Sequence, residues 1–254
     1  PTQLTSVPQD RNELGVYGRP FWAPQGDKIY FIWDSKIWSV GVAGGDPQLV
    51  LSGVHAGAAI SPDGTTLAVW KASGAGDQEV SSLWISSPPG SAPRKYEPSP
   101  FEFKGHSSPH YLCFSPDGSK IALSINPYIA PANVWILDWP DGPGAEQRSP
   151  FQELRPTQTT PVAWLPDSRT LVLCRDGGIL LGDSRDGLIR QITISEGGGQ
   201  NYPSVSPDGQ SIVFTSENSD FNIVEIPLDG SAYRSYLSTS RSEYSPSLSR
   251  TGDR

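Results

Sequence analysis

Methionine is absent from the 254-residue chain, even at position 1, and there are only two cysteines. We therefore expect a processed or excised piece of a longer protein, from which a targeting segment can have been removed. Two cysteines make neither a disulfide scaffold nor a zinc site. Cys113 and Cys174 each stand inside an apolar strand pattern, so we expect both to be buried free thiols.

Clusters of basic residues and long apolar runs are also lacking. The chain carries 19 Lys and Arg against 27 Asp and Glu, for a net charge of −8. A nucleic-acid surface needs grouped cations, so nucleic acid is excluded as a partner. No apolar run reaches the length of a membrane span and no signal peptide opens the chain, so direct membrane insertion is not expected.

A short turn motif recurs along the chain. Three copies read Ser-Pro-Asp-Gly, and two more, around Pro24 and Pro166, are altered at two positions each. Successive turn prolines stand roughly 40 to 55 residues apart, a period typical of repeat proteins. Pro presets φ, Asp bonds its own backbone and Gly accepts a left-handed conformation. The recurring acids are therefore predicted to be turn scaffold and not catalytic: Asp63, Asp117, Asp167 and Asp208.

Short apolar segments surround every turn. One precedes it, as at 112–114, and two follow it, as at 121–125 and 134–137. A fourth, more polar segment ends each unit. Four short strands with the polar one outermost form one blade of a propeller. The equivalent third-strand tryptophans Trp38, Trp84 and Trp135 are expected to fill the wedges between neighbouring blades.

The predicted fold is all-β, a single β-propeller domain over 1–254. Its blades are four-stranded and antiparallel, five complete and a sixth split between the two chain ends. The C-terminal part supplies only a first strand and a turn at Ser249, so we expect the parent chain to continue beyond Arg254. The expected blades cover about 18–53, 54–105, 106–154, 155–198 and 199–240, with the split blade formed from 1–17 and 241–254.

The repeat resembles the WD-like repeat of the TolB propeller family. The shared pattern is Pro-x-apolar-Ser-Pro-Asp-Gly, an apolar strand, and then an Ile-Trp or Ile-Val strand, from about Leu4 to Gly252. Gln25 and Ser168 depart from it at the turn. TolB is a periplasmic propeller that binds a lipoprotein, so the resemblance implies a bacterial, periplasmic or otherwise extracytoplasmic protein; a cytoplasmic location is the alternative. Similar propellers form sensor-like halves of bacterial Ser/Thr kinases and regulators, or cap prolyl-oligopeptidase-type peptidases.

Catalytic and cofactor motifs are missing from the sequence. The closest approach to a Gly-x-Ser-x-Gly nucleophile elbow, at 182–184, lacks the second Gly. The Gly-rich stretch 197–199 is assigned to a connection between blades, where it would not bind phosphate. His106 and His110 are four residues apart, but Ser-Ser-Pro between them breaks the helix that a metal pair would need. We expect no metal, no cofactor and no enzymatic activity; a cation in the central channel is the alternative.

Binding residues are expected on the loops that lead into the inner strands, together with the loops between second and third strands. In a propeller these share one face at the mouth of the central channel, and binding usually lies on loops held by such a scaffold. Long second-to-third loops at 71–82 and 126–132 favour this face; tolerated insertions are the alternative. The predicted binding residues are Arg19, His55, His110, Tyr128, Thr160, Asn201, Tyr202, Glu243 and Tyr244.

These polar and aromatic side chains suit recognition of a protein or peptide. The sequence therefore predicts a non-catalytic binding or sensing propeller of the TolB-like type, with its oligomeric state left open. One alternative is a regulatory or substrate-gating propeller of a larger enzyme, a Ser/Thr kinase or a prolyl-oligopeptidase-type peptidase, whose catalytic domain lies outside this segment. Another is an enzyme, such as a lyase or hydrolase, that uses the channel itself.

Overall fold

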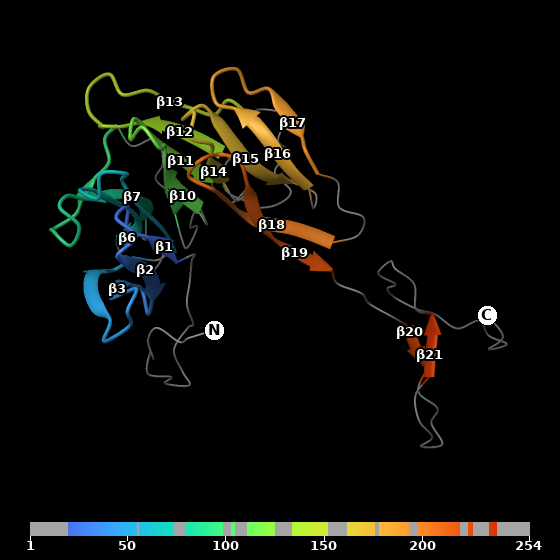
Figure 1. Cartoon of the computed structure of the whole chain (residues 1–254). Coiled ribbons are helices and arrows are strands. Elements are labelled where there is room, and N and C mark those ends of the chain that lie inside the picture. Colours follow the sequence, from blue (N-terminus) through green and yellow to red (C-terminus); the bar gives the residue numbers. More distant parts are fainter. Residues whose placement is uncertain are drawn as a thin grey trace.

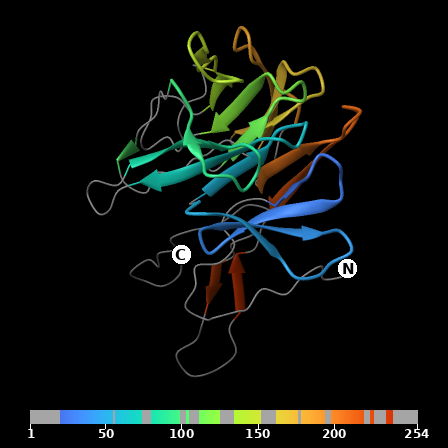
Figure 2. The ribbon, with the colours of Figure 1, turned by 90° about the vertical axis from the view of Figure 1, so that its left-hand side faces the viewer.

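The computed structural model of the chain is all-β in the part that it describes (Figure 1). Its strands form antiparallel sheets that follow one another in chain order (Figures 1 and 2). The prediction of a propeller built from four-stranded antiparallel blades is confirmed. The described residues are 20–54, 56–73, 80–98, 103–104, 111–124, 134–151, 162–175, 178–193, 198–218, 223–225 and 234–237.

Three sheets have the simple order of a propeller blade, in which each strand pairs with the next along the chain. The first contains β1 (Phe21–Trp22), β2 (Lys28–Trp33), β3 (Lys36–Gly41) and β4 (Gln48–Ser52). The third contains β10 (Tyr111–Phe114), β11 (Lys120–Ser124), β12 (Val134–Asp138) and β13 (Gln147–Arg148). The fourth contains β14 (Val162–Trp164), β15 (Thr170–Arg175), β16 (Gly178–Asp183) and β17 (Ile189–Gln191).

The second sheet is wider than the others. It contains β5 (Ala56–Ile60), β6 (Leu67–Ser73), β7 (Val80–Ser86) and β8 (Arg94–Lys95), and β9 (Phe103–Lys104) also pairs with β7. Lys71 pairs with Ser82 and Ser73 with Val80. The prediction of a loop over 71–82 is therefore wrong at both ends, because β6 and β7 continue into it as a hairpin.

The fifth unit contains its four strands as two separate pairs. They are β18 (Gly198–Val205) with β19 (Ile212–Asn218), and β20 (Ile223–Glu225) with β21 (Arg234–Leu237). The second pair lies apart from the first (Figure 1). β18 begins at Gly198, so the assignment of this Gly-rich stretch to a connection between blades is wrong. The two parts of the expected split blade, 1–17 and 241–254, lie outside the described residues.

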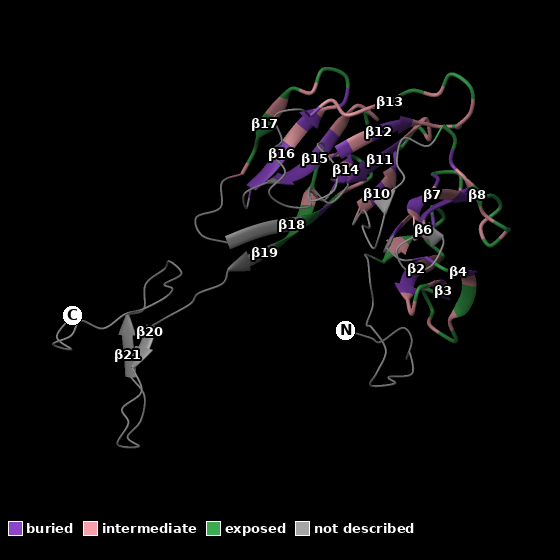
Figure 3. Ribbon diagram, turned by 180° about the vertical axis from the view of Figure 1, so that it is seen from behind, coloured by how far each residue is buried: buried purple, intermediate pink, exposed green. Residues whose placement is uncertain are grey.

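The second strands of the first four sheets are buried on both faces, which explains their continuous apolar sequences, whereas Val213 and Phe214 of β19 are exposed. In β11, Ile121 and Leu123 join the cluster shared with the second sheet, while Ala122 joins the cluster shared with the fourth. The two faces alternate with the period of two that a strand imposes. Figure 3 shows buried strands in the middle of the sheets, whereas β4 and β17 at the outer edges are largely exposed. The core is thus a series of interfaces between neighbouring sheets.

The tryptophans of the third strands contribute to these interfaces. Trp84 packs against the cluster between the first and second sheets, and Trp135 packs against the cluster between the second and third. The prediction that they fill wedges between blades is confirmed for these two. Trp38 packs within its own sheet, where its Nε1 donates to the carbonyl oxygen of Trp33 at 3.3 Å.

Each identical turn is closed by one set of hydrogen bonds. In the third sheet, the hydroxyl of Ser115 donates to Asp117 at 2.6 Å, the backbone N of Ser119 donates to the same carboxylate at 2.9 Å, and Gly118 N donates to the Ser115 carbonyl at 2.9 Å. The turns around Asp63 and Asp208 repeat this pattern. The turn acids therefore hold their own backbone, as predicted.

Electrostatics of the turn acids agree with that role. Burial raises the pKa of Asp117, but hydrogen bonds from Ser115 and Ser119 outweigh it and hold the pKa at about 2. Hydrogen bonds from Ser61 and Thr65 lower the pKa of Asp63. A carboxylate held in this way is a poor general acid or base at neutral pH.

Successive turns also contact one another around one end of the ring. Ser168 accepts a hydrogen bond from the backbone N of Asp117, at 3.0 Å. A Cβ built on Gly209 would lie 3.0 Å from Cδ of Pro166, and one built on Gly64 would lie 3.2 Å from Nε2 of Gln25. A Cβ built on Gly118 would lie 3.8 Å from Cδ of Pro62, which links the second turn to the third. Together these four approaches join the turns of the first five units into a chain at the end of the inner strands.

The second and third sheets are also joined at their outer strands. Arg94 on β8 makes two hydrogen bonds of 2.6 Å to the carboxylate of Asp141, which also accepts from the backbone N of Glu97 at 3.0 Å. The hydroxyl of Tyr96, a fully buried residue, donates to the carbonyl oxygen of Asp138 at 2.7 Å. Burial raises the pKa of Asp141, but the bonds from Arg94 and Glu97 outweigh it and lower the pKa.

Candidate binding site at the channel mouth

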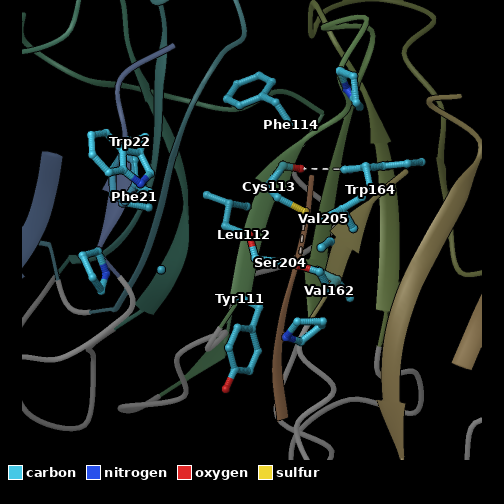
Figure 4. Close-up of a pocket in the computed structure, with 16 residues that line it drawn as sticks. Phe21, Trp22, Tyr111, Leu112, Cys113, Phe114, Val162, Trp164, Ser204 and Val205 are labelled. Atoms are coloured by element: carbon cyan, nitrogen blue, oxygen red, sulfur yellow. Dashed lines mark hydrogen bonds between the residues drawn. The ribbon is translucent and has the colours of Figure 1, made fainter. Parts of the chain in front are cut away.

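The inner strands line an open cavity of about 350 Å³ (Figure 4). Residues of β1, β5, β10, β14 and β18 line it. Each of these strands leads directly into its turn, so the chain of turns lies at one end of the cavity and the starts of the strands lie at the other. We call this second end the channel mouth. The turn acids are consequently at the end opposite the channel mouth.

Aromatic and apolar side chains make up most of the cavity wall. Figure 4 shows Phe21 and Trp22 on one side and Trp164 on the other, with Tyr111 at the start of β10. None of the described residues that line the cavity carries a charge. Burying an unpaired charge there would cost a large desolvation free energy, so the wall favours uncharged groups.

Polar groups of the wall tie neighbouring inner strands together. Trp164 donates from Nε1 to the carbonyl oxygen of Cys113 at 3.4 Å, and the thiol of Cys113 donates to the carbonyl oxygen of Val162 at 3.7 Å. Both bonds join β10 to β14 (Figure 4). Cys113 and Cys174 are free thiols, as predicted; Cys174 is buried, whereas Cys113 is only half-buried and lines the cavity.

Two tyrosines meet beside the mouth. The ring centroids of Tyr111 and Tyr202 lie 6.0 Å apart, with the ring planes at 58°. Tyr111 belongs to the third sheet and Tyr202 to the fifth unit, so the pair spans the inner strand of the fourth sheet. Tyr202 remains 43% exposed, directly before the cavity residue Pro203.

Only two of the predicted binding residues are among the described residues. Asn201 and Tyr202 lie in β18, where Asn201 pairs with Thr215, so their placement in a loop that leads into the strand is wrong. The ring of Tyr202 meets that of Tyr111, a residue that lines the cavity. The other predicted residues lie outside the described part: Arg19, His55, His110, Tyr128, Thr160, Glu243 and Tyr244.

Sequence reasoning missed the aromatic wall. Phe21, Trp22, Tyr111 and Trp164 were read as ordinary strand residues, yet all four line the cavity. A signal was present, because three of the inner strands, β1, β10 and β14, carry at least one aromatic ring. Trp22 is 58% exposed, which is unusual for a ring of this size inside a sheet.

Features of an enzyme centre are not found in the described residues. They contain no group of three or more His, Cys, Asp or Glu placed to hold a metal ion. Ser184 is buried at the end of β16, and Arg169 donates from Nε to the carboxylate of Asp183 at 2.7 Å. The segment 182–184 is therefore a strand end and not a nucleophile elbow.

No helix in the described part of the chain has the length and hydropathy of a membrane span.

Comparison with solved structures identifies the same fold. TolB from Acinetobacter baumannii matches with a TM-score of 0.60 at 16% identity, over 90% of this chain and 55% of that one. A TolB-type protein from Agrobacterium tumefaciens matches with a TM-score of 0.57 at 20% identity, over 88% of this chain and 80% of that one. The GH74 enzyme of Niastella koreensis matches with a TM-score of 0.57 at 16% identity, over 88% of this chain and 38% of that one.

The chain thus has a TolB-like β-propeller fold, and it spans about half the length of the Acinetobacter protein. No protein-family model matches the sequence. No curated protein matches it either. Because structures with this fold include both TolB and an enzyme, function has to be argued from the site.

Proposed function

We propose that this chain is a non-catalytic binding propeller that takes a segment of a protein or peptide at the channel mouth. The observation that carries the proposal is the uncharged aromatic cavity of about 350 Å³, framed by five inner strands. Its volume lies at the lower end of the range of ligand pockets, roughly 300 to 1,000 Å³. That is room for a few side chains of a partner and not for a folded element.

The chemistry of the wall supports binding over catalysis. General acid-base catalysis needs a titratable group near the reacting bond, and the described lining offers only a phenol and a thiol. The thiol of Cys113 is directed at a backbone carbonyl, and the turn acids lie at the other end of the channel. Aromatic rings with one wet edge are instead typical of recognition surfaces.

We extend the proposal to the compartment. The TolB-like fold and the repeat that resembles the TolB family favour a periplasmic or otherwise extracytoplasmic location. Fractionation of cells that express the full-length gene, with a cytoplasmic and a periplasmic marker followed in parallel, tests it. Recovery with the cytoplasmic marker alone contradicts this part of the proposal.

Selection from a random displayed-peptide library tests the binding function. Ser204 lines the cavity from an exposed position on β18, so Ser204→Trp should fill the cavity without displacing packed neighbours. Gln48→Trp, on the exposed outer strand β4, is the matched control. We expect peptides that bind the unaltered chain and Gln48→Trp but not Ser204→Trp. Failure to enrich any peptide, or equal binding to the filled variant, contradicts the proposal.

A further inference from the structure

Tyr202 has an unusual backbone conformation. Its φ is +56°, in the left-handed region that bulky side chains rarely adopt. The other described non-glycine residues with positive φ are Asp34, Ser35 and Ser168, which are small polar residues in tight turns. Tyr202 instead stands inside a strand, where this conformation costs free energy and is retained only if the surroundings impose it.

A β-bulge accompanies this conformation. The pairing of β18 with β19 shifts between Asn201 and Ser204, where Asn201 faces Thr215 and Ser204 faces Val213. β18 therefore holds an extra residue over this stretch. Bulges of this kind turn a side chain away from the direction that strict alternation would give it, and they often lie beside functional sites. Here the turned side chain is the ring that meets Tyr111 at the channel mouth.

We propose that Tyr111 and Tyr202 form a clamp that grips an uncharged, ring-bearing side chain, aromatic or proline, as it enters the channel from the partner. This inference rests on the proposed function and names the chemical class that the site takes. Tyr202 remains 43% exposed beside Tyr111, so a third ring can stack on the pair. Proline is also bound by aromatic-lined grooves of this kind.

The cavity beyond the clamp sets the same preference. Its described wall has no charge, and Phe21, Trp22 and Trp164 offer further ring surface. The whole chain, by contrast, carries a net charge of −8. The negative charge of the chain favours basic residues in the partner close to the inserted side chain, because complementary charge steers association. The inserted side chain itself should be uncharged, because the described cavity wall carries no charge to pair with it.

Small probes test the clamp on the full 254-residue chain. N-acetyltryptophanamide and N-acetylprolinamide represent the inserted ring, and N-acetyllysinamide represents a charged side chain. Binding is followed by saturation-transfer NMR and titration. We expect both ring-bearing probes, but not the lysine probe, to bind the unaltered chain.

Tyr202→Gly removes the ring and suits the left-handed backbone, so this variant should fold. Tyr111→Leu removes the other ring and keeps an apolar side chain against its neighbours. We expect each change to weaken binding of the ring-bearing probes about five- to tenfold. The double variant should be little weaker than either single one, because the two rings act together. Tyr202→Phe keeps the ring and should bind as the unaltered chain does.

Equal binding of the ring-bearing probes to the double variant and to the unaltered chain overturns the clamp. No binding of these probes to the unaltered chain, or equal binding of the lysine probe, overturns it too. Ser204→Trp separates this failure from that of the proposed function. If the clamp variants have no effect but Ser204→Trp abolishes binding, the cavity is still the site; if Ser204→Trp also has no effect, the channel is not used.

Discussion

Ser168 accepts a hydrogen bond from the backbone N of Asp117, 51 residues earlier and in the neighbouring sheet, at 3.0 Å. Ser168 occupies the position where the identical turns have Gly, and its φ is +52°. Serine in place of glycine thus strains the turn of the fourth sheet and joins it to the turn of the third. Left-handed φ costs a residue with a Cβ roughly 1 to 2 kcal/mol, about as much as the hydrogen bond contributes.

This balance predicts different outcomes for two small substitutions. Ser168→Ala removes the bond and keeps the strain, so the free energy of unfolding should fall by about 1 kcal/mol. Ser168→Gly removes both, so the loss should be close to zero. Urea unfolding of the three proteins measures the difference. Equal losses for Ala and Gly would show that the hydroxyl bond contributes nothing.

Gly187 allows a close approach between the third and fourth sheets. Its φ is +76°, and a Cβ there would lie 2.0 Å from the carbonyl oxygen of Pro150. Gly187→Ala should therefore lower the free energy of unfolding by roughly 3 kcal/mol or more. Gly26 has nearly the same φ, +71°, with nothing within 4 Å, so Gly26→Ala gives the backbone cost alone, about 1 to 2 kcal/mol. Similar losses for the two variants would refute the steric explanation.

Acid should destabilise the fold through the turn carboxylates. The folded pKa of Asp117 is about 2, below the value of about 3.9 in an unfolded chain. A lowered folded pKa means that the stabilisation is fully present above the unfolded pKa and is lost as pH falls through the folded one. The free energy of unfolding should therefore decrease between about pH 4 and pH 2.

Four other carboxylates add to this dependence on pH, because their pKa values are also lowered in the folded chain: Asp63, Asp141, Asp167 and Asp208. Asp117→Asn should be less stable at pH 7 and should lose less stability on acidification. Chemical unfolding at pH 7, 4, 3 and 2 follows both. An unchanged acid slope in Asp117→Asn would mean that this carboxylate is not among the groups that titrate.

Alanine substitutions test the predicted binding face beyond the described residues. His110→Ala, Tyr128→Ala, Tyr202→Ala and Tyr244→Ala should each weaken binding of a peptide selected on the unaltered chain, and the melting temperature should stay within a few degrees. Gln48→Ala on the outer strand is the control. Unchanged affinity across the four variants would remove the channel mouth from consideration as the binding face.

The repeat made most of the fold predictable from sequence. A turn such as Ser115 to Gly118 depends on local chemistry, and strands such as β11 bury both faces, so apolar runs between turns located the sheets. The longer reach of β6 and β7 was not predictable, because pairing of Lys71 with Ser82 is decided by neighbours across the sheet and not by apolar content.

The candidate site was less accessible to sequence reasoning. Tyr202 was selected for its position before an inner strand, but nothing in the residue type indicates a left-handed φ or a bulge. Both depend on the register of β18 against β19. Tyr111 was taken for a strand residue, and its proximity to Tyr202 requires the curvature that brings the third sheet near the fifth unit. Local patterns carry neither kind of information.

The contacts between successive turns have a consequence for how the units are ordered. The hydroxyl of Ser168 accepts a hydrogen bond from the unit before it, and Pro166 lies close to Gly209 of the unit after it. A turn sequence is thus fitted to its two neighbours as well as to its own strands. Exchanging a blade that has a Ser-Pro-Asp-Gly turn with one that has an altered turn would separate pairs such as Ser168 with Asp117 and Pro166 with Gly209. The altered turns are therefore expected to favour the order in which the blades follow one another in this chain.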